Sequence, residues 1–118
     1  MGNVEYRIAN VMDLELRAEG EWDLVVLTET AYYLGWQYPM FDLAWLAHEL
    51  FQQTRPTGRL LLANSIWDDR GIMSPWLVLS YRDLFRNVGY RLESEESMRG
   101  VKDEVEFSIL ISLFADPG

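Results

Sequence analysis

The feature that most constrains the fold of this chain is a short apolar run that ends in polar residues. Residues 22–27 read Trp-Asp-Leu-Val-Val-Leu, and Thr28-Glu29-Thr30 follow directly. A continuous apolar run of this length is typical of a strand that is covered on both faces, as parallel strands are. The run therefore predicts a central strand of a largely parallel sheet, with Thr28 and Glu29 at its carboxyl end.

Apolar spacing beyond this strand predicts a helix and a second buried strand. Leu43, Leu46, Ala47 and Leu50 recur at helical spacing, and the pattern stops at an Arg-Pro-Thr-Gly turn. We expect a helix over 41–54. The short apolar segment 59–63 after the turn then predicts a second strand that is also buried.

The two ends of the chain predict the remaining elements. Segment 4–9 alternates apolar and polar residues, which predicts a strand, with loop over about the next eleven residues. Ser80 with Asp83 resembles a capping box, and Gly89 is a natural terminator, so we expect a helix over 81–88. Extended segments follow over 90–98 and 105–114 and predict an antiparallel hairpin.

This order of elements predicts an α/β fold with crossover helices and an antiparallel pair at one edge of the sheet. Binding sites in such sheets lie outside the carboxyl ends of the strands. The rule points to three expected loops, which span residues 10–14, 28–36 and 64–71.

Length and composition restrict the classes of protein. A chain of 118 residues is one domain, and 49% apolar residues with no run near the roughly 20 that a membrane span needs indicates no membrane segment. The formal net charge of −9 argues against a nucleic-acid partner, which needs a basic face. The absence of cysteine and of an export signal favours a cytoplasmic location.

Four segments carry a resemblance to a known family. They are Val-Glu-Tyr-Arg-Ile-Ala-Asn-Val (4–11), Trp-Asp-Leu-Val-Val-Leu-Thr-Glu-Thr-Ala-Tyr-Tyr-Leu (22–34), Thr-Arg-Pro-Thr-Gly-Arg-Leu-Leu-Leu (54–62) and the final helix with its hairpin. In order and spacing they resemble the C-terminal two-thirds of a class I S-adenosylmethionine-dependent methyltransferase, of the small-molecule type that includes nodulation N-methyltransferases. The resemblance implies a partial Rossmann-like sheet that contains strands 3, 4, 5, 7 and 6 of the family.

The resemblance also exposes an absence. The family's Gly-rich turn and ribose-binding acid come before the segment that 4–11 resembles, and no Gly-x-Gly occurs in this sequence. We therefore expect residues 1–118 to be a single truncated domain that binds S-adenosylmethionine weakly or not at all. Its open sheet edge predicts pairing of segment 4–9 directly with 22–27, aggregation, association with a companion N-terminal half, or, as the preferred outcome, a homodimer.

The resemblance implies cofactor-binding and catalytic roles at the first two loops. Asn10 would hydrogen-bond the adenine, Val11 would pack on it, and Thr28 would lie near the sulfonium. Glu29 would orient an amine or hydroxyl and take its proton as the catalytic carboxylate. Asn10 is equally well explained as a turn-forming residue, and Glu29 as a loop residue that caps the next turn.

Aromatic and amide side chains near these loops suggest an acceptor site. Tyr32, Tyr33, Asn64 and Trp67 would contact the small-molecule acceptor, and aromatic faces would favour a cationic amine. Trp36 and Tyr38 are better explained by packing. Adjacent Asp68 and Asp69 lack a third carboxylate at a supporting spacing, so we expect no metal site.

Two functions from different classes remain open at this point. The first is methyl transfer from S-adenosylmethionine to nitrogen or oxygen of a small molecule, with little activity in this chain alone. The alternative is a noncatalytic module, derived from a methyltransferase, that associates through its open sheet edge. An unrelated small α/β binding domain is a third possibility if the strand order differs from the expected one.

Overall fold

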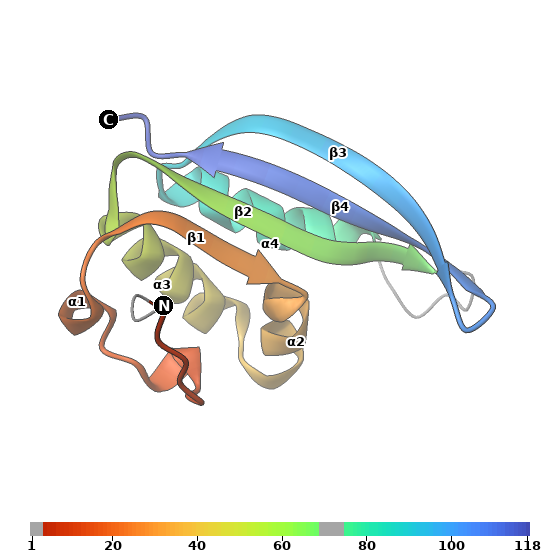
Figure 1. Ribbon diagram of the computed structural model, residues 1–118, viewed down its shortest axis with the longest axis horizontal. Coiled ribbons are helices and arrows are strands. Elements are labelled where there is room, and N and C mark those ends of the chain that lie inside the picture. The colour runs from red at the N-terminus through yellow and green to blue at the C-terminus, as the bar shows by residue number, and fades with distance from the viewer. Residues whose placement is uncertain (1–3, 69–74) are drawn as a thin grey trace.

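The described residues form one four-stranded mixed sheet with helices beside it (Figure 1). The computed structural model describes residues 4–68 and 75–118, apart from the side chains of residues 32, 33 and 68. Its elements in chain order are η1 (Val11–Asp13), α1 (Leu16–Glu19), β1 (Trp22–Thr28), α2 (Thr30–Gln37), α3 (Met40–Gln52), β2 (Thr54–Asp68), α4 (Pro75–Val88), β3 (Arg91–Lys102) and β4 (Val105–Ala115).

The sheet has the strand order β1-β2-β4-β3. β1 and β2 are parallel, with Leu27 opposite Leu62, whereas β4 runs antiparallel to both β2 and β3. The α/β fold class and the terminal antiparallel hairpin are confirmed. Within the described residues β1 pairs on one side only, which leaves its other edge open.

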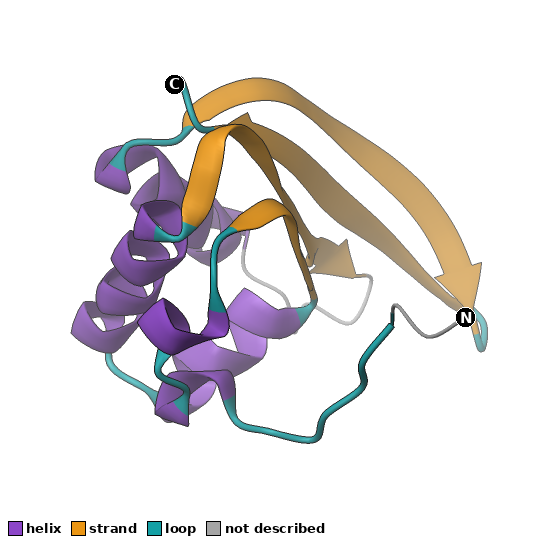
Figure 2. Cartoon of the chain, turned by 60° about the vertical axis from the view of Figure 1, so that its left-hand side comes forward, coloured by secondary structure: helices purple, strands orange, loops and turns teal. Residues whose placement is uncertain are grey.

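The described helices cover one face of the sheet, as Figure 2 shows from the side. On that face Leu60 and Phe114 are fully buried, and Leu62 is nearly so. Leu61 and Ala63, which point the other way along β2, are only half-buried. Successive strand residues alternate between the faces, so the same strand contributes to a dense core on one side and to an open surface on the other.

The expected helix over 41–54 is confirmed as α3, which begins after Pro39 and ends at Gln52. Its buried residues Leu43, Leu46 and Leu50 follow the spacing that predicted the helix, because three- and four-residue steps return to the same face.

The strand expected over 4–9 is not formed, and its direct pairing with β1 was wrong. The segment is irregular, and Tyr6 and Ile8 are almost fully exposed. Arg7 pairs with Glu19 and, chiefly through that hydrogen bond, lowers the pKa of the Glu19 carboxyl. Alternation of apolar and polar residues predicts which side chains a strand would bury, but a strand also needs a partner for its backbone N–H and C=O groups.

The other differences concern helices. The expected loop over 28–36 contains α2, and the expected loop after residue 10 contains η1 and α1. The helix expected over 81–88 begins earlier, at Pro75, which suits the first turn of a helix because it has no backbone N–H. Ser80 does not cap this helix: its hydroxyl donates to the Trp76 carbonyl one turn earlier, at 2.9 Å.

Among residues 4–68 and 75–118, the helices are too short or too polar to cross a lipid bilayer.

Candidate functional site

The candidate site lies where β1 and β2 end side by side. Thr28 at the end of β1 is opposite Ala63 of β2, and the Glu29 N–H donates to the Ala63 carbonyl at 2.7 Å. Glu29 then takes a left-handed backbone (φ 57°, ψ 13°), and α2 begins at the next residue. This conformation costs roughly 1–2 kcal/mol for a residue other than glycine. The strand end therefore presents a strained acidic residue at a sharp turn.

Ser65 holds the Glu29 side chain in place. Its hydroxyl donates to Glu29 Oε1 at 2.7 Å, and both side chains are half-buried. The sequence analysis did not select Ser65. In the sequence, only its position two residues after Ala63 distinguishes it. That position places Ser65 beside the end of β1 only once the parallel register of β1 and β2 is known.

Asn64 lies on the other face of the sheet from Ser65, because the two residues are consecutive in β2. It is 1% exposed and shares its face with Leu60 and Leu62 under the helices. Its Oδ1 atom is buried with no hydrogen-bond partner in the described structure, an arrangement that costs roughly 1–3 kcal/mol. The structure therefore does not bring Asn64 together with Glu29 on one surface.

The other predicted acceptor residues lie in different surroundings. Trp67 is 38% exposed and lines a cavity of about 160 Å³ against the β3–β4 hairpin, with Arg99 and Phe107. Tyr32 and Tyr33 belong to α2, and their side chains lie outside the described part of the structure.

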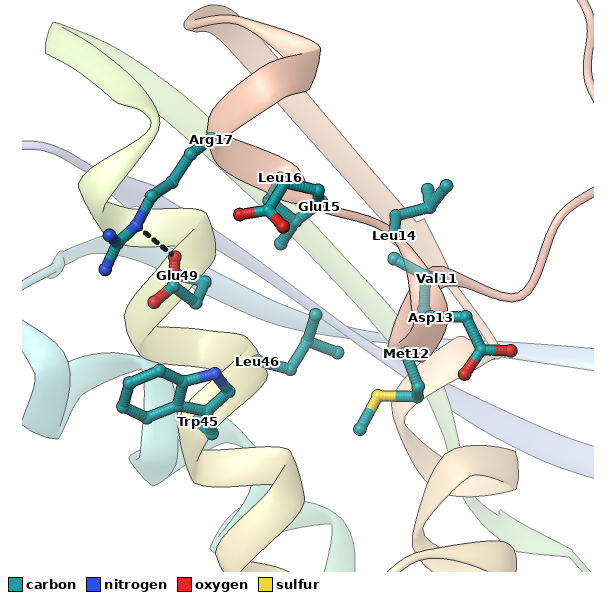
Figure 3. Close-up of a pocket in the computed structure, with 10 residues that line it drawn as sticks. All are labelled: Val11, Met12, Asp13, Leu14, Glu15, Leu16, Arg17, Trp45, Leu46 and Glu49. Atoms are coloured by element: carbon teal, nitrogen blue, oxygen red, sulfur yellow. Dashed lines mark ion pairs between the residues drawn. The ribbon is translucent and has the colours of Figure 1, made fainter.

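Of the predicted cofactor residues, Asn10 and Val11 lie before β1, and Thr28 is its last residue. Asn10 caps η1: its Oδ1 accepts from the Met12 N–H at 3.0 Å, and its Nδ2 donates to the Tyr38 hydroxyl at 2.8 Å. Each of these amide atoms can still form a second hydrogen bond, so the turn-forming role leaves room for a ligand. Val11 lines a cavity against α3 (Figure 3), and Thr28 is exposed.

The described residues contain no group of three or more His, Asp or Glu side chains that could hold a metal ion. The expectation that Asp68 and Asp69 form no metal site lies outside the described residues, because neither the side chain of Asp68 nor any part of Asp69 is described.

Comparison with known proteins gives matches in structure only. No protein-family model matches the chain, and no curated protein matches it in sequence. The N-methyltransferase NodS from Bradyrhizobium japonicum WM9, solved with S-adenosyl-L-homocysteine, superposes with a TM-score of 0.68 at 16% identity, over 93% of this chain and 53% of NodS.

Two further solved structures have the same fold at slightly higher identity. One, from work on the conversion of a disulfide bond into a thioacetal group in echinomycin biosynthesis, has a TM-score of 0.61 at 21% identity, over 93% of this chain and 54% of its own. The other, a candidate DNA modification methylase from Thermus thermophilus, has a TM-score of 0.60 at 20% identity, over 92% of this chain and 51% of its own.

These matches describe the fold and not the substrate, because proteins of one fold act on unrelated acceptors. The chain spans about half the length of the solved structures it matches. The strand order β1-β2-β4-β3 and these superpositions together show that the chain has the fold of part of a Rossmann-like methyltransferase.

Proposed function

We propose that this chain supplies the acceptor-side part of an S-adenosylmethionine-dependent methyltransferase that acts on a nitrogen or oxygen atom of a small molecule. The observation that carries the proposal is Glu29: a carboxylate at the carboxyl end of β1, in a strained turn and held by Ser65. Strained residues cluster at functional sites, and ligands of open α/β sheets bind outside the carboxyl ends of the strands.

Glu29 has the chemistry that an amine or hydroxyl acceptor needs. The cofactor, when bound, supplies a methyl group on a cationic sulfur. Glu29 accepts a hydrogen bond from the acceptor N–H or O–H, which aims the acceptor's lone pair, and it takes the proton that the methylated product releases. The Ser65 hydroxyl limits rotation of the carboxylate by occupying Oε1.

Asn10, Val11 and Thr28 are the residues of this chain that would hold the cofactor. The spare hydrogen-bonding capacity of the Asn10 amide fits an adenine ring, and Thr28 adjoins the acid that binds the acceptor. Because the sequence contains no Gly-x-Gly turn, we expect the chain alone to bind the cofactor weakly and to have little or no activity.

The acceptor itself would lie near Glu29, which Ser65 holds in place, with Tyr32, Tyr33 and Trp67 as further contacts. Asn64 is not part of this proposal, because it is buried under the helices on the other face of the sheet. The formal charge of −9 favours a small-molecule acceptor over nucleic acid, and the lack of cysteine fits a cytoplasmic protein.

A noncatalytic interaction module is the second candidate, and the open side of the sheet favours it. Leu24 is 56% exposed and Val26 is 49% exposed on β1, beside an edge that pairs with no described strand. A companion half or a second copy of the chain could pair there. Light scattering after size exclusion at micromolar concentration tests the homodimer: a monomer argues against it.

Titration of the chain with S-adenosylhomocysteine, followed by backbone amide NMR, tests the first proposal. We expect shifts at Asn10, Val11 and Thr28 with a Kd no tighter than about 1 mM, near −4 kcal/mol. Micromolar binding would contradict the weak-cofactor part of the proposal. Shifts that appear at other residues and not at Asn10, Val11 and Thr28 would contradict their assignment.

Glu29→Gln tests the catalytic assignment once activity is restored by a companion fragment that carries a Gly-rich turn. We expect turnover to fall at least about tenfold, because a general base contributes roughly 10²–10⁴ to such rates, while cofactor affinity stays the same. Glu96→Gln on the exposed surface of β3 is the matched control. An unchanged rate in Glu29→Gln would remove Glu29 from the acceptor site.

A further inference from the structure

A second cavity lies away from the strand ends, between the N-terminal turn and α3 (Figure 3). Its volume is about 270 Å³, room for roughly nine water molecules at about 30 Å³ each. The space is open to solvent on one side, and its volume is large enough for a small organic molecule.

The inner end of the cavity contains a buried carboxylate. Glu49 is 8% exposed, and its Oε2 lies 3.5 Å from Nε of Arg17. That separation is longer than a normal charge-assisted hydrogen bond, and the Arg17 side chain is 69% exposed. Arg17 therefore holds the buried carboxylate only loosely from the solvent side, and a ligand cation that makes a shorter contact with Glu49 can take its place.

An aromatic ring lies beside this carboxylate, and apolar side chains complete the walls of the cavity. Trp45 precedes Glu49 by one helical turn on α3, so the indole and the carboxylate share a face of the helix. Trp45 is 56% exposed, although part of it packs against His48 with the ring centroids 5.5 Å apart. Leu46 projects from α3 towards the N-terminal turn, and Met12 lies opposite it on that turn, as Figure 3 shows.

We propose that this cavity binds a primary organic ammonium ion with an apolar body. The ammonium group pairs with Glu49 in place of Arg17, beside the indole of Trp45, and the body packs on Met12 and Leu46. Aromatic faces attract cations, and apolar walls favour a carbon skeleton over a bare metal ion. An anion is disfavoured because Glu15 also lines the cavity and the chain carries a net charge of −9.

The probe for this proposal is phenethylammonium, compared with neutral 2-phenylethanol of nearly the same shape. Amide and indole NMR shifts of the full chain report binding at residues 11–17 and 45–49. We expect phenethylammonium to bind with a Kd of roughly 1 mM and the alcohol to bind at least about tenfold more weakly, because it lacks the charge. Equal binding of the two, or no shifts in these segments, would overturn the proposal.

Three variants locate the interaction. Glu49→Gln is expected to weaken phenethylammonium binding about tenfold, and Trp45→Leu about threefold, in line with an exposed cation–π contact. Arg17→Gln is expected to tighten binding about twofold, because it removes the competing guanidinium. A merely structural role for Arg17 would not produce that gain, so unchanged or weaker binding by Arg17→Gln would count against the proposal.

Matched controls use similar residues elsewhere on the surface. Trp76→Leu on α4, where Trp76 is 69% exposed, and Glu96→Gln on β3 should leave the Kd unchanged. An equal loss in Trp76→Leu would mean that the probe binds exposed tryptophans without preference. If Glu49→Gln fails to fold, the alcohol comparison and Arg17→Gln still decide the outcome in folded protein.

S-Adenosylhomocysteine separates this site from the proposed cofactor site, since Val11 contributes to both assignments. We expect phenethylammonium to bind with the same Kd in its presence. If the two ligands displace each other, the cavity belongs to the cofactor site, and the proposal of a separate ammonium site is overturned. The two proposals fail independently, because loss of cofactor binding leaves the phenethylammonium titration unaffected.

Discussion

The two faces of the sheet carry similar aliphatic side chains but have different surroundings. Under the helices, Leu60 is fully buried and Leu27 is 9% exposed. On the opposite face, Leu24 is 56% exposed and Val26 is 49% exposed, although they belong to the same apolar run as Leu27. An apolar run indicates that both faces of a strand can be buried. Each face is buried only where another element packs on it.

The difference identifies which part of the molecule supplies its stability. Burial of apolar area contributes roughly 25 cal/mol per Å², so the helix-covered face contributes most of the favourable free energy. The open face contributes little in the isolated chain and is available to a partner. Four predictions test this contrast, beginning with the largest expected effect.

Phe114→Ala on the covered face should lower the free energy of unfolding by about 3–5 kcal/mol, because the cavity it leaves lies between Phe85 and Tyr90. Leu113→Ala, the neighbouring residue on the open face, should cost about 1 kcal/mol and serves as the control. Urea denaturation measures both. Equal losses would show that the two faces are equally covered in solution.

Raising the pH should weaken the covered face through Tyr90. Burial raises the pKa of Tyr90 to about 12 from its ordinary value of 10, so folding favours the neutral phenol. The resulting stability is complete below pH 10 and is lost as the pH rises towards 12, by roughly 2 kcal/mol. Denaturation at several pH values measures the loss.

Tyr90→Phe is the control for that pH dependence. The Thr54 hydroxyl donates to the Leu50 carbonyl at 2.8 Å, so the Tyr90 hydroxyl is the donor in its 2.6 Å hydrogen bond with Thr54. The variant should lack this hydrogen bond. Its free energy of unfolding should also not fall between pH 10 and 12. A Tyr90→Phe curve as steep as that of the parent chain would assign the effect to other groups.

Ser65→Ala should have a smaller effect, since it removes one half-buried hydrogen bond to Glu29. We expect a loss of about 0.5–1.5 kcal/mol in the free energy of unfolding. The exposed Ser94 on β3 offers Ser94→Ala as a control with almost no change. Equal effects of the two variants would mean that the Ser65–Glu29 hydrogen bond contributes nothing in solution.

Val26→Lys on the open face should have the smallest effect, within about 0.5 kcal/mol, because the lysine ammonium can reach water there. Unfolding at two protein concentrations measures the change. A loss above about 2 kcal/mol, or one that depends on protein concentration, would show that a second copy covers this face.

The sequence predicted the elements that depend on local pattern. β1, the core of β2 and α3 follow from continuous or periodic apolar residues, and the polar residues that end β1 correctly located Glu29 at a strand end. The strand over 4–9 was wrong because alternation of apolar and polar residues does not by itself supply a backbone partner, and this segment does not pair with the open edge of β1. Helix α2 was missed because it follows the polar residues that end β1 and is apolar and aromatic almost throughout, so its sequence has no alternation of an apolar and a polar helix face.

The candidate site divides in the same way. The sequence by itself determined the residue types available at the strand ends, because the polar residues that follow apolar runs are a local property. Only the tertiary structure decided that Ser65 meets Glu29, that Asn64 turns towards the helices, and that Glu49 faces a cavity. Those outcomes depend on the register of strands and on which face the helices cover, and both are set by contacts between residues far apart in the chain.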